Sequence, residues 1–140
     1  MARLNTYIFF DGRCAEAMHF YEQALGGRIE MMSTYADSPM AASLPTGFDA
    51  ARIIHARLVI DGLTLMASDI GPGMPYEGMK GFSLSLDFPT PEAAKPVFDS
   101  LAAGGQVQMP LQATFWAAAF GMLVDRFGTP WMIGCEKVAG

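Results

Sequence analysis

The sequence predicts an α+β protein of two βαβββ modules, which form a curved eight-stranded mixed sheet with helices outside and a cleft inside. Three observations favour this fold. The strand and helix patterns of residues 4–68 recur in the same order in residues 82–135, which indicates an internal duplication. A Gly-Gly pair ends the helical pattern in both halves, at 26–27 and 104–105. Hydrophobic residues make up 51% of the 140 residues, enough for a full core.

The first module begins with a strand at 4–10, which is rich in aromatic and β-branched residues. Apolar residues at helical spacing predict a helix over 14–25, which the glycine pair ends. A strand at 28–35 and a long small-residue loop at 36–50 follow. Strands at 52–60 and 63–68 form a hairpin, because Asp61-Gly62 is a strong turn dipeptide.

The second module repeats this order after the Gly/Pro-rich segment 69–81. Its helix, over 90–103, has Thr90 as N-cap and Pro91 at the first helical position, and Pro96 is expected to bend it or loosen its start. The predicted strands lie at 82–88, 106–111, 115–125 and 130–135. The modules span about 1–70 and 80–140 of a single domain, and one or both of the loops 36–50 and 69–81 are expected to cover the cleft.

Composition excludes several classes of function. The net charge is −5 and no Lys/Arg cluster occurs, which argues against binding nucleic acid or an anionic membrane. No apolar run approaches the roughly 18 residues of a membrane span, and residues 1–13 lack a signal-peptide pattern, so we expect a cytoplasmic protein. Cys14 and Cys135 are expected to be free thiols. Cys14 begins a helix, a position that can lower the pKa of a thiol.

Alternation along the strand 52–60 separates an apolar face from one that carries His55 and Arg57. The apolar face belongs against the helix, so His55 and Arg57 are predicted to point into the cleft. His55 is either a general base or ligand anchor, or a hydrogen-bonded structural histidine. Asp69 either binds a ligand, pairs with Arg57 or caps a turn. His19 is interpreted as a solvated helix residue.

The stretch "QATFWAAAF" (112–120) combines large aromatics with small residues. Alternation places Thr114, Trp116 and Ala118 on one face, and Phe115, Ala117 and Ala119 on the other, with Gln112 at the strand's entrance. A tryptophan between Gln and Thr offers a flat apolar surface with polar groups beside it, as small-molecule pockets do. The alternative is plain core packing. Asp125 is expected to begin a structural hairpin turn, and Glu136 to lie outside the cleft.

Three blocks, "FFDGRCAEAMHFYEQALGG", "IIHARLVIDGLTLMASD" and "MPLQATFWAAAFGMLVDRFGTPWMI", resemble the PhnB-like branch of the vicinal-oxygen-chelate superfamily, which includes glyoxalase I and the bleomycin-resistance proteins. The resemblance implies a homodimer. It also implies that metal-dependent members take a His from the first strand and a Glu from the last strand of each module. Those positions hold Asn5 or Tyr7, Ser83 or Ser85, Met66 and Met132. Such residues do not suit a hard cation, so no divalent metal or other cofactor is expected.

The resemblance also carries the name of a 3-demethylubiquinone methyltransferase. The glycine-rich string at 71–75 is interrupted by Pro72 and Pro75, and no helical pattern follows it, so we do not expect this activity. The favoured function is a small-molecule-binding protein without the usual metal. The alternatives are an enzyme that uses His55 as general base, and a vestigial domain selected for its dimer. The candidate ligand-binding residues are Tyr7, Arg57, Asp69, Gln112, Thr114 and Trp116.

Overall fold

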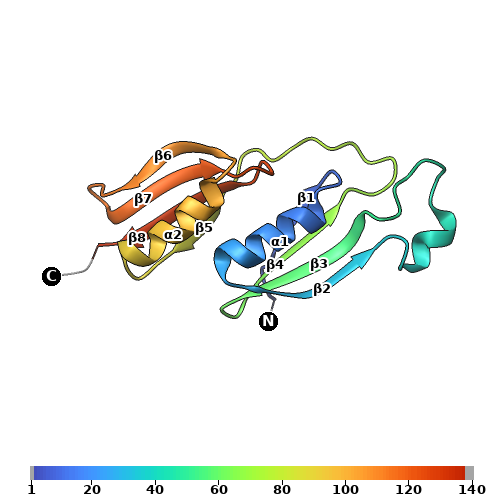
Figure 1. Cartoon of the computed structure of the whole chain (residues 1–140), viewed down its shortest axis with the longest axis horizontal. Coiled ribbons are helices and arrows are strands. Elements are labelled where there is room, and N and C mark those ends of the chain that lie inside the picture. Colours follow the sequence, from blue (N-terminus) through green and yellow to red (C-terminus); the bar gives the residue numbers. More distant parts are fainter. Residues whose placement is uncertain (1, 138–140) are drawn as a thin grey trace. The chain divides into compact units, whose positions relative to one another are not determined.

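The computed structural model describes residues 2–137, and the chain divides into two compact units, Met1–Glu77 and Gly78–Gly140. The units correspond to the two predicted modules, and each contains one βαβββ sequence of elements (Figure 1). The elements of the first unit are β1 (Thr6–Phe10), α1 (Cys14–Leu25), β2 (Arg28–Thr34), a short 3₁₀ helix η1 (Pro39–Ser43), β3 (Ile53–Ile60) and β4 (Leu63–Asp69). Those of the second unit are β5 (Leu84–Asp87), α2 (Pro91–Ala102), β6 (Gln106–Gln112), β7 (Ala117–Val124) and β8 (Pro130–Glu136).

Both units have the same sheet topology. The strand order is β1-β4-β3-β2 in the first and β5-β8-β7-β6 in the second. In each, the first and last strands of the module pair in parallel, and the remaining pairs are antiparallel. The predicted duplication and the α+β class are therefore confirmed, with the eight strands in two four-stranded mixed sheets.

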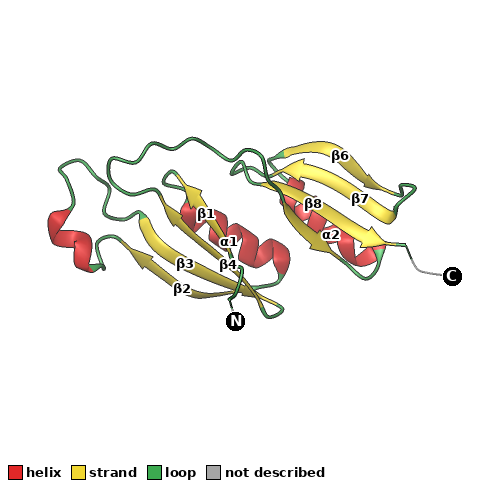
Figure 2. Ribbon diagram, turned by 180° about the vertical axis from the view of Figure 1, so that it is seen from behind, coloured by secondary structure: helices red, strands yellow, loops and turns green. Residues whose placement is uncertain are grey.

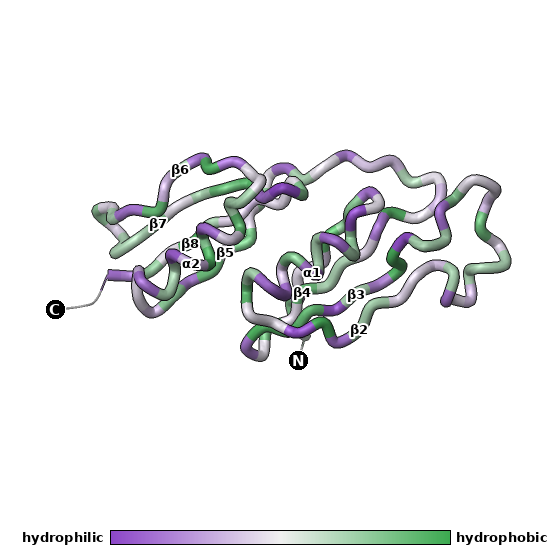
Figure 3. The backbone as a smooth tube through the Cα atoms, in the orientation of Figure 1, coloured by the Kyte–Doolittle hydropathy of each residue, from purple (hydrophilic) through white to green (hydrophobic). Residues whose placement is uncertain are grey.

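Each helix lies against one face of the sheet of its own unit and leaves the other face without a helix (Figure 2). The helix-covered face carries the core. In the first unit its fully buried members include Phe10, Met18, Tyr21, Ala56 and Leu58. In the second unit β7 is apolar along its length (Figure 3), and Ala117, Ala119 and Leu123 alternate toward the buried side. We call the uncovered side the open face of each sheet.

A glycine pair ends the first helix as predicted, and the second pair follows α2 after the C-cap residue Ala103. Gly26 and Gly104 adopt left-handed backbone angles, with φ of 69° and 76°. Gly27 and Gly105 are needed for another reason. A Cβ on Gly27 would lie 2.8 Å from the carbonyl oxygen of Val59, and a Cβ on Gly105 would collide with the carbonyl oxygen of Val124. The chain therefore passes from helix to strand in contact with the neighbouring strand's backbone, at equivalent places in both units.

Local signals set several other boundaries. The Thr90 side chain accepts a hydrogen bond of 3.1 Å from the Ala93 N–H, which confirms the predicted N-cap, and α2 continues through Pro96. Asp61 and Gly62 both have positive φ in the β3–β4 hairpin, as a type I′ turn requires. The sequence did not predict η1 inside the loop 36–50. No helix among the described residues is long and apolar enough to cross a membrane.

The close approach at Gly27 predicts that Gly27→Ala destabilises the chain by about 1–3 kcal/mol, because the new methyl group must displace backbone. Urea unfolding followed by circular dichroism measures the change. Gly71→Ala is the matched control, since a Cβ there meets the Tyr35 hydroxyl at an ordinary 3.4 Å. An equal effect of the two substitutions would contradict the account of Gly27.

Candidate functional site

The open face of the first sheet carries the predicted residues Tyr7, His55 and Arg57. Ile8 and Phe10 on β1, and Ala56 and Leu58 on β3, are buried on the α1 side. Because successive side chains of a strand point to opposite faces, their neighbours face away from the helix. Tyr7 is 39% exposed and Phe9 is 50% exposed, which agrees with that placement.

Tyr7 and His55 form a direct pair on this open face. The Tyr7 hydroxyl lies 3.1 Å from His55 Nδ1, and the two rings are stacked with their centroids 5.7 Å apart. Phe9 extends the cluster, with its ring centroid 5.1 Å from that of Tyr7. When the hydroxyl donates to Nδ1, the imidazole proton sits on Nε2. The pair thus fixes the imidazole's orientation, and in this tautomer it leaves an aromatic surface with one N–H donor beside it.

Arg57 lies two residues along β3, and its guanidinium is 3.4 Å from Glu30 on the neighbouring strand β2. Both side chains are close to half exposed, so the ion pair contributes little to stability. The sequence left a pairing of Arg57 with Asp69 open, and the structure gives Arg57 a different partner. Arg57 therefore stays on the open face, within reach of solvent.

Asp69 lies on the other side of the sheet from His55. Its side chain is 2% exposed and accepts three backbone hydrogen bonds, from Gly12 at 2.8 Å, Cys14 at 3.0 Å and Ile53 at 2.9 Å. The carboxylate thus ties the loop before α1 to the start of β3. Among the alternatives for Asp69, capping is the one that the geometry supports. Asp69 is not brought together with Tyr7, His55 or Arg57.

The carboxylate of Asp69 also affects Cys14. Burial raises the pKa of the Cys14 thiol far above its ordinary value, and the nearby Asp69 carboxylate raises it further. The position at the start of α1 had suggested a lowered pKa. That suggestion is wrong for this thiol, because loss of water and a like charge outweigh the helix terminus. Cys14 and Cys135 are both free and buried, as free thiols were predicted.

In the second unit, Gln112, Thr114 and Trp116 are not on one continuous strand. Gln112 is the exposed last residue of β6. The Thr114 hydroxyl accepts a hydrogen bond of 3.0 Å from the Ala117 N–H, and the Thr114 N–H donates to the Ala117 carbonyl at 3.1 Å. These bonds make a turn, so β7 begins at Ala117 rather than at Phe115. Thr114 therefore has a structural role, and the predicted alternation does not apply to residues 114–116.

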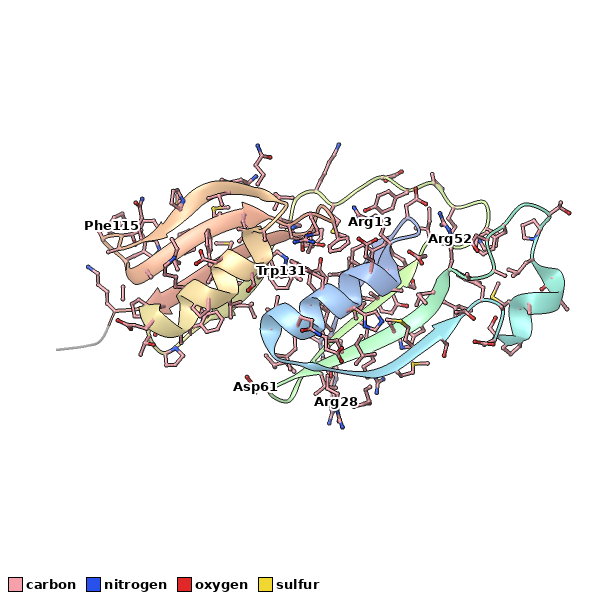
Figure 4. The ribbon with its side chains drawn as sticks, in the orientation of Figure 1. Arg13, Arg28, Arg52, Asp61, Phe115 and Trp131 are labelled. Carbon is pink, nitrogen blue, oxygen red and sulfur yellow. The ribbon has the colours of Figure 1, made fainter. Side chains whose placement is uncertain are left out.

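Trp116 is half exposed, at 51%, and contacts two other aromatic rings. Its centroid lies 4.8 Å from that of Phe115 and 5.5 Å from that of Phe120, both in edge-to-face geometry. Phe115 had been predicted on the face opposite Trp116. It is instead 87% exposed beside the end of the β6–β7 hairpin (Figure 4), because it precedes the strand.

A cavity of about 430 Å³ lies beside Trp116, and its other walls include Phe120, Asp87, Gly134 and Glu136. Sequence reasoning missed Asp87 and placed Glu136 outside the cleft. The sequence signal that could have placed Glu136 on this face is the alternation along β8, because Gly134 and Glu136 follow Met132 at steps of two. Of the predicted residues in this unit, Trp116 is the one that the structure brings to a cavity.

The two parallel strand pairs hold the positions that the family resemblance assigns to a cation in metal-dependent members. Tyr7 pairs with Met66 and Ser85 pairs with Met132, which agrees with the equivalence obtained by counting. Phenol, hydroxyl and thioether groups do not match the carboxylate and imidazole ligands that Mg²⁺, Mn²⁺ or Fe²⁺ prefer. Among residues 2–137, no group of three or more His, Cys, Asp or Glu side chains could hold a metal ion. These residues do not fit the superfamily's cation.

Asp69→Ala is predicted to lower the free energy of unfolding by about 2–4 kcal/mol, because three backbone N–H groups lose a buried charged acceptor. Arg57→Ala is the control on the open face, with an expected change below about 1 kcal/mol. Chemical denaturation of both variants measures the difference. A mild effect of Asp69→Ala would show that water replaces the carboxylate and that the loop does not depend on it.

Comparison with known proteins agrees with the observed fold. Residues 2–134 match the family described as 3-demethylubiquinone-9 3-methyltransferase. The structure is similar to that of protein PA1353 from Pseudomonas aeruginosa, with a TM-score of 0.89 and 47% identity over 99% of this chain and 100% of that one. The PhnB protein of Bacillus cereus gives a TM-score of 0.80 and 26% identity over 96% and 99% of the two chains.

A glyoxalase/bleomycin-resistance/dioxygenase domain from Frankia sp. EAN1pec shares the fold, with a TM-score of 0.69 and 12% identity over 100% of this chain and 96% of that one. The match along residues 2–134 and the two module topologies lead to the same assignment. The chain belongs to the 3-demethylubiquinone-9 3-methyltransferase family, and it shares its fold with the PhnB protein and with the glyoxalase/bleomycin-resistance/dioxygenase domain.

Proposed function

We propose that this protein binds a small organic molecule without a divalent metal at the superfamily's ligand positions. The observation that carries the proposal is the Tyr7–His55 pair. Its hydrogen bond and stacked rings lie on the open face of the first sheet, where the core does not need them. Aromatic surfaces with a few fixed polar groups are what small-molecule sites use for affinity and orientation.

The chemistry of this face indicates which ligand features it can recognise. The Tyr7 and Phe9 rings offer a flat apolar surface, and the imidazole beside them offers a hydrogen bond. If Tyr7 donates to Nδ1, Nε2–H is the donor, so a ligand oxygen or other acceptor fits there. The Arg57 guanidinium, two residues away on β3, favours an acceptor with negative charge, although Glu30 competes for it.

The second candidate function is an enzyme of the superfamily that uses His55 as general base. The Tyr7 contact supports it, because the hydroxyl can also accept a hydrogen bond from Nδ1–H and leave Nε2 unprotonated for the substrate. This requires the opposite tautomer from the binding mode described above. A second catalytic group on the same face would be needed, and Arg57, held by Glu30, is the charged group that β3 supplies.

Methyl transfer, the activity in the family's description, is not what we propose. The usual S-adenosylmethionine site needs a glycine turn that leads into a helix N-terminus. Residues 70–83 contain the glycines of that string, but α2 does not begin until Pro91. The homodimer and the cytoplasmic location expected from the sequence stay predictions.

The binding proposal is tested with chelator-treated protein and a library of small carboxylates, amides and phenols, followed by ligand-observed NMR. We expect ligands that bind without added metal. His55→Ala should weaken them by roughly tenfold, the loss of about one good hydrogen bond. Tyr7→Phe should weaken them less, because the ring remains and only the hydroxyl that orients the imidazole is lost.

His19→Ala is the matched control, since His19 is the other histidine of the chain and lies exposed on α1. It should bind every ligand as the unmodified protein does. Ligands that require stoichiometric Mg²⁺, Mn²⁺ or Fe²⁺ would contradict the proposal. Turnover of a bound compound that His55→Ala abolishes, with binding retained, would establish the enzyme instead.

A further inference from the structure

The cavity beside Trp116 has a lining unlike that of the first sheet's open face. It measures about 430 Å³, within the range of small-molecule pockets, and lies entirely within the second unit. Its charged walls are Asp87 at the end of β5, Glu136 at the end of β8, and Lys137 next to it in the chain. The cavity therefore combines two carboxylates, one ammonium group and the rings of Trp116 and Phe120.

Gly134 forms the floor between the carboxylate and the aromatic wall. The strand register places Asp87, Gly134 and Phe120 in one row across β5, β8 and β7. A Cβ on Gly134 would lie 3.3 Å from Asp87 Oδ1 and 3.7 Å from Phe120 Cδ1. Because glycine has no side chain, the space between this carboxylate and this ring stays open. The carboxylate and the ring therefore face the same small volume.

The carboxylates are available to a ligand. Within residues 2–137, neither the Asp87 nor the Glu136 side chain makes a hydrogen bond or ion pair. Glu16 on α1 and Asp99 on α2 differ from them, since Glu16 is 3.0 Å from Arg13 and Asp99 is 2.8 Å from Lys95. With two carboxylates against the one Lys137 ammonium, the cavity favours a cation over an anion.

The aromatic wall of the cavity also favours a positively charged ligand. Trp116 contacts Phe115 and Phe120 in edge-to-face geometry and stays half exposed, so part of its ring surface remains for a ligand. A tryptophan ring is the best aromatic partner for an ammonium ion within about 6 Å of its centroid. Aromatic rings also cover the apolar part of an organic cation.

We propose that this cavity binds an organic ammonium ion, with its nitrogen at Asp87 and Glu136 and its apolar body against Trp116 and Phe120. The inference rests on the proposed small-molecule binding and names a ligand class for the second unit. The carboxylates supply charge-assisted hydrogen bonds, which are about twice as strong as neutral ones. The aromatic rings supply the contact area, and Lys137 disfavours a ligand that carries a second positive charge.

The test uses three probes of similar size and different charge: 2-phenylethylamine, 2-phenylethanol and phenylacetate. The readout is the indole N–H signals of the ¹⁵N-labelled full chain, which has two tryptophans. Trp116 lines the cavity, whereas Trp131 is buried and its indole donates to Asp125 at 2.8 Å. The amine should shift the Trp116 signal, leave that of Trp131 in place, and bind at least about threefold more tightly than the alcohol.

Asp87→Asn should reduce amine affinity roughly three- to tenfold and leave the alcohol unchanged, because it removes charge and keeps the shape. Asp99→Asn, on α2 and already paired with Lys95, is the control and should change nothing. Gly134→Ala should weaken amine and alcohol together by filling the floor, and an unchanged Trp131 signal confirms that it folds.

Equal affinity for amine and alcohol would overturn the assignment of a cation and leave small-molecule binding standing. Tighter binding of phenylacetate would also overturn it, since Lys137 would then dominate. If no probe moves the Trp116 signal up to its solubility limit, the cavity is not a site for this class. The proposed function is tested separately, by the metal-free ligand screen and the effect of His55→Ala on binding.

Discussion

The contact between the second glycine of each pair and a strand carbonyl is the constraint on which both units depend. At Gly27 and Gly105 the chain leaves its helix so close to Val59 or Val124 that no side chain fits. This contact sets where β2 and β6 enter their sheets, and thereby which residues of β3 and β7 face the helix. Since the strand faces alternate, it also decides which residues remain on the open face.

The sequence predicted most of the fold, because the signals for it are local and repeated. The apolar spacing of 14–25 and the glycine pair specified α1 to the residue, and alternation along β3 correctly opposed His55 to Ala56. Reasoning failed where a specific hydrogen bond decides the outcome. The Thr114–Ala117 turn delays β7, and for Asp69 the sequence left capping, pairing with Arg57 and ligand binding open until its backbone hydrogen bonds decided for capping. The Cys14 pKa depends on burial, which a helix position does not disclose.

Duplication gives the two units one backbone plan and lets their open faces differ in chemistry. Equivalent positions hold Tyr7 beside Met66 in one unit and Ser85 beside Met132 in the other. The first face presents the stacked Tyr7 and His55 rings and the Arg57–Glu30 ion pair, whereas the second presents carboxylates around a tryptophan. A topology that fixes register but not side-chain type can thus carry two recognition surfaces without any change in its core.

The burial of both cysteines has a practical consequence for spectroscopy. Cys14 and Cys135 are shielded from solvent, and for Cys14 burial and the Asp69 carboxylate hold the sulfur in its protonated, unreactive form. Thiol-directed spin labels or fluorophores are therefore not expected to react with the native cysteines. A cysteine introduced at the exposed Asp61 turn, and another on the outer side of α2, would form a clean pair for distance measurements between the modules, with no native residue to remove first.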